Sequence, residues 1–215
     1  MTDVMDQLRN GTRDLHVAAE RQELQQRLAA GSLGRGDYVA WLEQMLLVHR
    51  ALEGALAERM DADPRFAAVT RRQLQVPYLL EDLAALGADP ATIEAVPAVA
   101  AFASAAAAAA RDEPLRLLGF HYVLEGSNNG NRFIVRALAP RLGLKAESGA
   151  RYLDPYGPEQ PALWQAFKSE MSRVPFTAGE LALLVEAARE MFATIASLSA
   201  ELGERFEGAT LPEAP

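Results

Sequence analysis

The chain carries almost no pattern that is typical of a β-strand. Apolar and polar residues do not alternate over any sustained length, β-branched residues rarely cluster, and Ala, Leu, Glu, Arg and Gln are abundant. Long segments instead place apolar residues at helical spacing, as in "YVAWLEQMLLVHRALEGALAERM" at 38–60. We find no internal repeat and no linker. These features predict an all-α protein built as one helical bundle.

Capping and turn residues locate the ends of the expected helices. Thr177-Ala-Gly-Glu is a capping box, and Asp89-Pro90 offers an N-cap followed by proline at the first helical position. The predicted helices cover 3–28 with a bend near Glu23, 38–60, 71–86 despite Pro77, 90–110, 115–138, 162–174, and a stretch from Thr177 onward. The connection 143–161 is long for a compact domain. We expect one domain over 1–206 and a flexible tail over 207–215.

Composition excludes several kinds of chemistry. With 215 residues, half of them hydrophobic, the chain can bury a core without metals or disulfides. It has no cysteine, which excludes disulfides, thiolate nucleophiles, iron–sulfur clusters and covalent c-type haem attachment. Its net charge of −8 argues against a surface that neutralises many phosphates. We therefore expect no nucleic-acid partner.

Targeting and membrane signals are also missing from the sequence. The first residues, "MTDVMDQLRN", lack the basic-then-apolar order of a signal peptide. The longest weakly apolar run, "VPAVAAFASAAAAAA", is too short and too rich in alanine to span a bilayer convincingly. The sequence thus predicts a soluble, cytoplasmic protein without a membrane partner.

The histidines are the first candidates for a metal site. They are His16, His49 and His121, and none follows a glutamate at the Glu-x-x-His spacing of di-iron bundles. No P-loop, dinucleotide fingerprint or Gly-x-Ser-x-Gly elbow is present either. Metal chemistry, if present, must therefore use another arrangement.

His16 has charged neighbours at helical spacing. Arg9, Arg13, His16 and Glu20 run along one edge of an apolar stripe at intervals of four, three and four residues. A metal-binding imidazole usually donates its second N–H to a carboxylate, a carbonyl or water, and Glu20 is placed for that. Arginines can pair with ligand carboxylates. The same residues also fit a solvated helix flank with ordinary ion pairs, and spacing alone does not decide between the two interpretations.

The stretch "LEGSNNGNRF" at 124–133 interrupts an otherwise helical segment. Glycine, serine and asparagine weaken a helix, so Gly126 could end one helix and Ser127 or Asn128 could cap the next. Alternatively, Gly126 and Gly130, at i and i+4, leave one face of a continuous helix without side chains. Such a helix could lie flat against a planar ligand. The two interpretations predict different backbones.

Together these motifs resemble a known family. "LRNGTRDLHVAAE" at 8–20 resembles the proximal helix of heme oxygenases. "YVLEGSNNGNRF" at 122–133 resembles their distal helix, closest to a bacterial branch with Glu-Gly-Ser-Asn there. "FKSEMSRVPFTAGELALLVEAAREMF" at 167–192 is similar to the C-terminal pair of helices. The resemblance spans most of the chain and is weakest over 60–110.

The resemblance implies a set of site residues. His16 would be the axial iron ligand of haem, with Glu20 as its hydrogen-bonding partner. Further haem contacts would come from Arg9, Arg13, Tyr122, Lys168 and Phe192. On the distal side, the residues that direct catalysis would be Gly126, Ser127, Asn128 and Gly130.

The chain departs from the family pattern at several positions. Animal-type members have a distal aspartate where this chain has Ser127, although the bacterial branch lacks that aspartate too. Asn129 and Asn131 stand where an apolar and a small residue are usual, which bears on the water network and hence on the position of ring cleavage. His121, one turn before Glu125, either faces the pocket or is structural.

The resemblance further implies a function. The chain would cleave haem at a meso carbon to biliverdin, carbon monoxide and iron, with haem as both cofactor and substrate and with O2 as oxidant. No flavin or nicotinamide motif is present, so electrons would come from a ferredoxin, a flavodoxin or a reductase, and a bilin-accepting protein is a second conceivable partner. The alternative is a haem-binding carrier or sensor on the same fold that leaves the ring intact.

Overall fold

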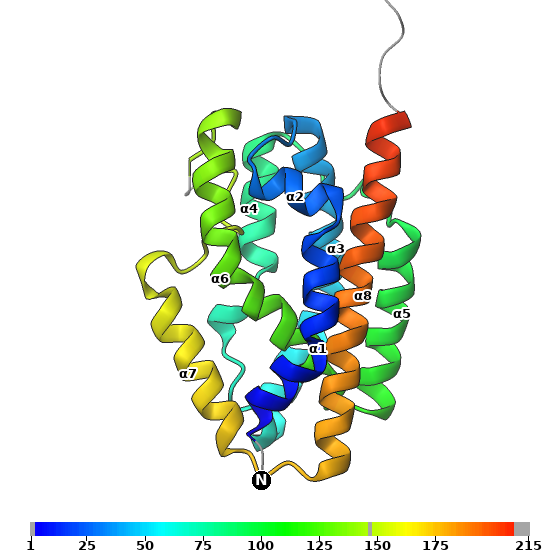
Figure 1. Ribbon diagram of the computed structural model, residues 1–215, viewed down its shortest axis with the longest axis vertical. Coiled ribbons are helices and arrows are strands. Elements are labelled where there is room, and N and C mark those ends of the chain that lie inside the picture. Colours follow the sequence, from blue (N-terminus) through cyan, green and yellow to red (C-terminus); the bar gives the residue numbers. More distant parts are fainter. Residues whose placement is uncertain (1–2, 146–147, 209–215) are drawn as a thin grey trace, which may run out of the picture.

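The computed structural model describes residues 3–145 and 148–208, and it is helical throughout these ranges apart from turns and loops (Figure 1). The α-helices are α1 (Val4–Glu20), α2 (Glu23–Ala29), α3 (Arg35–Ala62), α4 (Val76–Leu86), α5 (Pro97–Asp112), α6 (Arg116–Leu142), α7 (Gln160–Arg173) and α8 (Ala178–Gly208). Short 3-10 helices cover Pro64–Phe66, Arg71–Gln73 and Gly157–Glu159. No strand occurs in the described ranges, so the predicted all-α class is confirmed.

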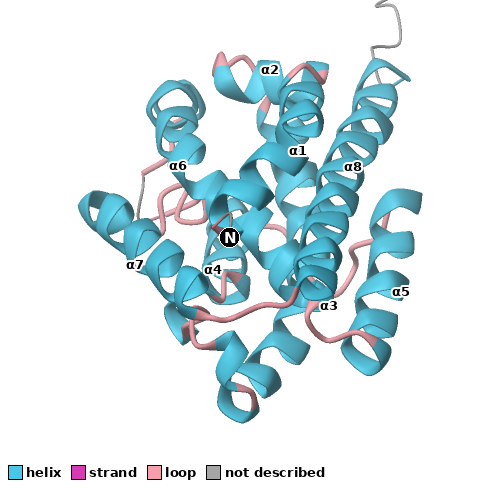
Figure 2. Ribbon diagram, turned by 60° about the horizontal axis from the view of Figure 1, so that its bottom comes forward, coloured by secondary structure: helices cyan, strands magenta, loops and turns pink. Residues whose placement is uncertain are grey.

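Helix α8 is the central packing partner of the bundle. It packs along α1 and α6, and α5 covers its other side, while α7 stands at the opposite edge of the molecule (Figures 1 and 2). Gly119 brings α6 and α8 together, because a Cβ atom there would lie 2.4 Å from the carbonyl oxygen of Leu184 and 2.7 Å from Cβ of Ala187. This close approach ties the first half of α6 to the core.

Several helix ends lie where the sequence predicts them. The break near Glu23 is present, because α1 ends at Glu20 and α2 begins at Glu23. At the start of α8, the Thr177 N–H donates to Oε2 of Glu180 at 2.8 Å and the Glu180 N–H donates to Oγ1 of Thr177 at 3.3 Å. These reciprocal bonds confirm the capping box.

Two predicted helix starts are wrong. The segment expected over 71–86 is α-helical only from Val76, and Arg71–Gln73 before it form a separate 3-10 helix. Pro77 lies in the first turn of α4, where a missing N–H removes no helical hydrogen bond. Asp89 does accept a hydrogen bond from the Ala91 N–H at 2.9 Å, but this caps only a turn. The next helix begins at Pro97 instead.

The connection between α6 and α7 is held by the bundle although most of it is irregular. Tyr38 donates its hydroxyl to the carbonyl oxygen of Gly149 at 3.0 Å. The buried carboxylate of Asp82 accepts the N–H groups of Arg151 and Tyr152, both at 2.8 Å. These bonds satisfy backbone groups that burial would otherwise leave unpaired.

The expected tail at 207–215 is only partly covered by the structure. Helix α8 continues through Gly208, and residues 209–215 lie outside the described residues. The domain limits of 1–206 therefore stay a prediction. None of the described helices combines the length and the apolar character that crossing a membrane requires.

Candidate functional site

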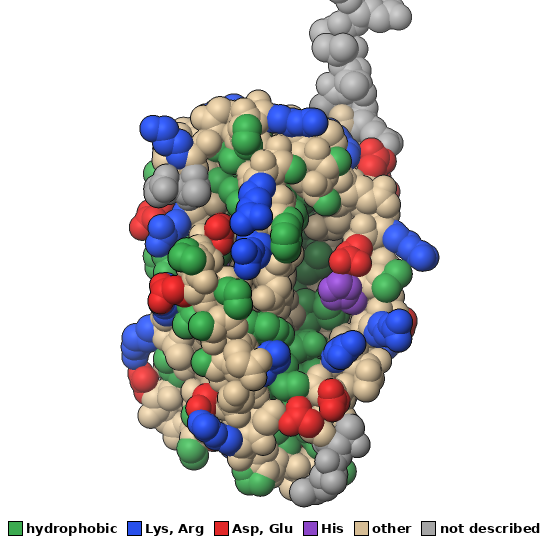
Figure 3. All heavy atoms as spheres, turned by 60° about the vertical axis from the view of Figure 1, so that its left-hand side comes forward, with side chains coloured by type: hydrophobic (Ala, Val, Ile, Leu, Met, Phe, Trp, Pro, Cys, Tyr) green, Lys and Arg blue, Asp and Glu red, His purple; other side chains and the backbone are tan. Residues whose placement is uncertain are grey.

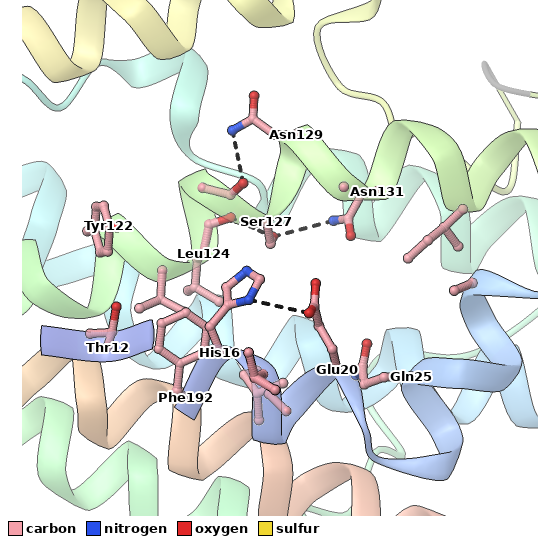
Figure 4. Close-up of a pocket in the computed structure, with 18 of the residues that line it drawn as sticks. Thr12, His16, Glu20, Gln25, Tyr122, Leu124, Ser127, Asn129, Asn131 and Phe192 are labelled. Atoms are coloured by element: carbon pink, nitrogen blue, oxygen red, sulfur yellow. Dashed lines mark hydrogen bonds and ion pairs between the residues drawn. The ribbon is translucent and has the colours of Figure 1, made fainter. Parts of the chain in front are cut away.

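A cavity of about 1030 Å³ opens between α1 and α6 (Figure 4). Its size is at the upper end of the range usual for small-molecule and cofactor sites. Trp41, Met45 and Tyr152 form part of its wall, and Trp164 from α7 and Phe192 from α8 also contribute. Of the predicted site residues, the cavity is lined by Arg9, Arg13, His16, Glu20, Tyr122, Gly126, Ser127, Gly130 and Phe192.

Helix α1 presents His16 to the cavity. The imidazole points from α1 toward α6, and its Nδ1 lies 3.5 Å from Oε2 of Glu20, one turn later (Figure 4). The ring of Phe192 meets it edge-on with a centroid distance of 5.4 Å. The His16 side chain is 55% exposed, and no described residue forms a hydrogen bond with its Nε2. That nitrogen can therefore bind a ligand in the cavity while Nδ1 faces a carboxylate.

The predicted propionate contacts divide between two adjoining cavities. Arg9 and Arg13 are exposed and line the main one. Lys168 lines a second cavity of about 580 Å³ instead. Arg9, Tyr122 and Trp164 belong to both linings, so the two spaces meet at these side chains. Lys168 thus lies beside the main cavity without lining it.

Helix α6 passes through the Gly-Ser-Asn-Asn-Gly stretch without a break. The interpretation of this stretch as a turn is therefore wrong, and a continuous helix with a thin face is correct. A Cβ atom on Gly130 would meet nothing within 4 Å, whereas one on Gly126 would lie 3.4 Å from Cη2 of Trp164. Gly130 leaves α6 bare where it borders the cavity, and Gly126 gives room to the indole ring.

The polar side chains of this stretch return hydrogen bonds to their own helix. Ser127 donates its hydroxyl to the carbonyl oxygen of Leu124 at 2.7 Å, and the amide of Asn131 donates to Oγ of Ser127 at 3.4 Å. The amide of Asn129 donates to the carbonyl oxygen of Gly126 at 3.0 Å. Ser127, Asn129 and Asn131 all line the cavity, but the amide of Asn129 points away from His16 (Figure 4).

Asn128 does not line the cavity, contrary to our expectation. It is 2% exposed, and its amide donates to Oε2 of Glu125 at 3.2 Å. The reason is geometric, because each residue advances the helix by about 100° and Asn128 therefore shares the face of Glu125 rather than that of Ser127. The two neighbouring asparagines, Asn129 and Asn131, line the cavity instead.

His121 is structural rather than a cavity residue. It is buried, it does not line the cavity, and its ring packs edge-on against Phe167 at a centroid distance of 5.8 Å. Burial lowers the pKa of His121 to about 3, so the ring is neutral at neutral pH. Of the two interpretations of this residue, the one that leaves it in the protein interior agrees with the structure.

Sequence patterns gave no indication of a polar cluster on the other side of α6. The Tyr156 hydroxyl donates to Oε2 of Glu125 at 2.8 Å, and the Gln160 amide donates to Oδ1 of Asn129 at 3.3 Å. Tyr156 lies near the end of the long connection, and Gln160 is the first residue of α7. Burial raises the pKa of Glu125 to about 7, although the hydrogen bonds from Tyr156 and Asn128 oppose that rise.

A second buried cluster supports the cavity wall at Tyr152. His49 places Nε2 at 3.1 Å from the Tyr152 hydroxyl and Nδ1 at 2.8 Å from Oε1 of Glu53. The Val76 N–H donates to Oε2 of the same carboxylate at 3.1 Å. Only Tyr152 of this cluster reaches the cavity. Its signal in the sequence is the i, i+4 pair of His49 and Glu53 on the long amphipathic helix.

Residues 3–145 and 148–208 contain no group of three or more His, Asp and Glu side chains that could hold a metal ion by themselves. The cavity instead offers one accessible imidazole, two guanidinium groups, apolar and aromatic walls and a bare stretch of helix. This combination suits a planar ligand that brings its own metal and carries carboxylates.

Comparisons with known proteins give one family match. The family model described as "Heme oxygenase" matches residues 2–201. No curated protein matches the chain at a significant level.

Solved structures give the same picture of the fold. The haem complex of heme oxygenase-1 from the cyanobacterium Synechocystis aligns with a TM-score of 0.87 and 18% identity, over 97% of this chain and 96% of that one. Heme oxygenase-2 from the same organism, with haem and NO, aligns with a TM-score of 0.89 and 20% identity, over 97% of this chain and 88% of that one. Heme oxygenase from Leptospira interrogans aligns with a TM-score of 0.86 and 20% identity, over 93% of this chain and 100% of that one. At these identities, the similarity establishes the fold.

Proposed function

Because the chain belongs to the heme oxygenase family, we propose that it cleaves haem at a meso carbon to biliverdin, carbon monoxide and iron, with O2 and electrons from an external donor. One observation carries this proposal. His16 on α1 points across the cavity toward α6, where Gly130 removes the side chain from the opposite wall. A ring can lie between the two helices only if one side offers a ligand for its metal and the other leaves it room.

The residues present fit haem. Nε2 of His16 is accessible. Arg13 and Arg9 lie one and two turns earlier on the same helix, where they can pair with propionates. The cavity of about 1030 Å³ is large enough for a ligand of this class. When bound, haem would supply both the iron that activates O2 and the porphyrin that is oxidised.

The proximal residues would bind haem and orient it. His16 would hold the iron, and Glu20, 3.5 Å from Nδ1, would fix the tautomer that leaves Nε2 free. Phe192 packs against the edge of the imidazole and limits its rotation. Arg9 and Arg13 would set the rotation of the ring in its pocket, and Lys168 would act from the adjoining cavity.

The distal residues on α6 would leave room for the ring and would help to deliver protons. Gly126 and Gly130 keep α6 thin, and Tyr122 borders the cavity on the same helix. The Ser127 hydroxyl accepts from Asn131 and donates to the carbonyl of Leu124, so it can relay a proton only together with water. We assign the ordering of that water to Ser127, Asn129 and Asn131.

The test is to titrate purified protein with hemin, then add ascorbate in air with catalase present and follow the haem band. We expect a histidine-ligated haem spectrum that gives way to that of biliverdin. His16→Ala should abolish the ligated spectrum and the conversion, and free imidazole should restore the spectrum of His16→Gly. Because His16 is largely exposed, neither change should unfold the protein.

The alternative function is a haem carrier or sensor. The observation in its favour is the pair Asn129 and Asn131 on the cavity wall, which changes the polar environment over the ring. In the same experiment a carrier would bind hemin through His16 and leave it intact after reduction in air. Only the addition of ascorbate in air, after the hemin titration, separates the two functions.

A further inference from the structure

The wall of the main cavity contains a tyrosine whose hydroxyl faces a base. Of the described tyrosines, Tyr122 and Tyr152 line this cavity. The Tyr152 hydroxyl lies 3.1 Å from Nε2 of His49, whereas the Tyr122 hydroxyl lies beside that of Thr12. An imidazole nitrogen can take up a proton near neutral pH, and a hydroxyl group cannot. Of these two phenols, Tyr152 is therefore the one with a base positioned to receive its proton.

Glu53 sets the tautomer of His49. Its Oε1 lies 2.8 Å from Nδ1 of His49, and its two oxygens also accept the N–H groups of Gln75 and Val76. An ionised carboxylate only accepts hydrogen bonds, so this contact assigns the imidazole proton to Nδ1. Nε2 is then the acceptor of the hydrogen bond from the Tyr152 hydroxyl.

Burial couples the loss of an electron from Tyr152 to the loss of its proton. Tyr152 and His49 are 2% and 3% exposed. Burial and the nearby carboxylate of Glu53 raise the pKa of Tyr152 well above its ordinary value, so the phenol keeps its proton at rest. An oxidised phenol is a strong acid, and an unpaired positive charge in the interior is costly. Transfer of the proton to His49 avoids that cost, because the imidazolium forms beside the Glu53 carboxylate.

The neighbouring aromatic side chains lack such a base. Trp41 also lines the cavity, and its ring centroid lies 5.7 Å from that of Tyr152. Its Nε1 is buried without a hydrogen-bond partner in the described part of the chain. Tyr38 stacks on Trp41 at 6.0 Å, and its hydroxyl donates to a backbone carbonyl, which does not take up a proton near neutral pH. Among these three rings, Tyr152 is therefore the one that can be oxidised to a neutral radical.

The cavity is open to small oxidants. Figure 3 shows a hollow in the surface with hydrophobic side chains inside it and a histidine at its edge. Hydrogen peroxide can enter there and be reduced to water at a haem held by His16, which takes two protons from solvent and two electrons. Resting on haem binding by the proposed function, we propose that Tyr152 is a redox-active tyrosine that returns one electron to the oxidised haem while its phenolic proton moves to Nε2 of His49.

This step leaves a neutral tyrosyl radical and an imidazolium paired with the Glu53 carboxylate. The O–H bond of Tyr152 breaks and an N–H bond forms on His49, so the net charge of the three side chains rises by one as the electron leaves. The second electron that peroxide removes has to come from an external reductant such as ascorbate. Tyr152 would thereby limit the damage that peroxide does to the ring and to the pocket.

The test follows the radical rather than turnover. Hemin-loaded protein is mixed with hydrogen peroxide in the absence of catalase, frozen rapidly and studied by electron paramagnetic resonance. We expect the signal of a neutral tyrosyl radical, narrowed when the protein carries ring-deuterated tyrosine. Tyr152→Phe should lose this signal. The matched control is Tyr38→Phe, which removes the hydroxyl of a buried tyrosine that lines neither cavity, and it should keep the signal.

The base is tested with one variant and with the hemin-free wild type. His49→Phe removes the proton acceptor and should also lose the tyrosyl signal; a signal that persists would overturn the role of His49. In the hemin-free protein, 15N NMR at neutral pH should show His49 protonated at Nδ1 alone. A proton on Nε2 would overturn the proposal, because that nitrogen could not accept another. This measurement does not depend on how a variant folds.

The hemin titration, made first, separates this inference from the proposed function. Failure of the wild type to bind hemin would contradict both. Hemin binding without a tyrosyl radical after peroxide, or with an equal signal in the wild type and Tyr152→Phe, would overturn this inference alone.

Discussion

The hydroxyl of Tyr156 donates a 2.8 Å hydrogen bond to Oε2 of Glu125, a carboxyl group on α6 that is 1% exposed. The other oxygen, Oε1, has no hydrogen-bond partner among the described residues. One turn further along α6, Asn129 accepts a hydrogen bond from the amide of Gln160, which follows Tyr156 by four residues. The end of the long connection and the start of α7 thus hold α6 at two points one turn apart, at the stretch where the helix is intrinsically weakest.

Replacing Glu125 should change how stability depends on pH. The pKa of Glu125 is about 7 in the folded protein against 4.5 for an ordinary glutamate. A raised pKa means that this group penalises folding as it ionises, so its favourable contribution is complete below about pH 4.5 and is lost as pH rises through 7. The full loss corresponds to roughly 3 kcal/mol. Glu125→Gln should therefore be more stable than the wild type at pH 8 and close to it at pH 5.

Urea unfolding between pH 5 and pH 8 checks this prediction, with the exposed Glu58→Gln on α3 as the control. Tyr156→Phe should have the opposite effect. It leaves the carboxylate of Glu125 with one hydrogen-bond donor fewer, and it should lower the free energy of unfolding by about 1–3 kcal/mol at pH 8. A Glu125→Gln variant that is equally destabilised at every pH would show that the carboxyl group is not the titrating one.

Gln160→Ala should loosen the middle of α6. Gln160 is 1% exposed, and its amide reaches Asn129 from outside the helix. Loss of such a bond costs about 1 kcal/mol, which corresponds to roughly fivefold faster exchange of the protected amides over 126–131. Hydrogen exchange followed by mass spectrometry measures this. Gln165→Ala, an exposed change on the same helix α7, should leave the exchange as it is.

Much of this architecture follows from the sequence, and the limits are physical. Helical periodicity is a local property that many residues share, so the all-α class and the ends marked by Glu23 and Thr177 are predictable. The continuity of α6 is not, because glycine and asparagine favour a turn there and the helix depends on distant partners. Gly119 against α8, Trp164 beside Gly126, and the bond from Tyr156 supply that support.

The candidate site shows the same division. His16 and Glu20 are predictable as a pair because a helix brings residues four apart to one face, and the structure has them 3.5 Å apart. The face of Asn128 depends on how α6 is rotated in the bundle, and Glu125 with Tyr156 sets that rotation. The position of Lys168 relative to the main cavity depends on where α7 packs. These are tertiary relationships that local sequence does not specify.

Gly130→Ala should separate stability from ligand binding. An added methyl group would meet nothing in the protein, so the helix gains about 0.5–1 kcal/mol of stability without haem. The same methyl group projects where α6 borders the cavity, and it should weaken hemin binding at least tenfold. Thermal unfolding and hemin titration measure the two effects. Weaker stability together with unchanged affinity would place the ligand elsewhere.

Lys168→Ala should act on the orientation of the ligand rather than on its retention by His16. Lys168 lines the adjoining cavity, which meets the main one at Arg9, Tyr122 and Trp164. Without that cation, the ring should bind in a changed ratio of rotational positions or with a few-fold lower affinity. Chromatography of the biliverdin isomers and a hemin titration report on both. If neither quantity moves, Lys168 lies outside the site.

The most direct test of the proposed function is the amount of carbon monoxide that the hemin-loaded protein releases when ascorbate is added in air with catalase present. Deoxymyoglobin traps the gas and reports it by its absorption spectrum. We expect about one equivalent of carbon monoxide per haem from the wild type and none from His16→Ala. Intact haem with no carbon monoxide from the wild type would contradict it and would identify a haem carrier or sensor.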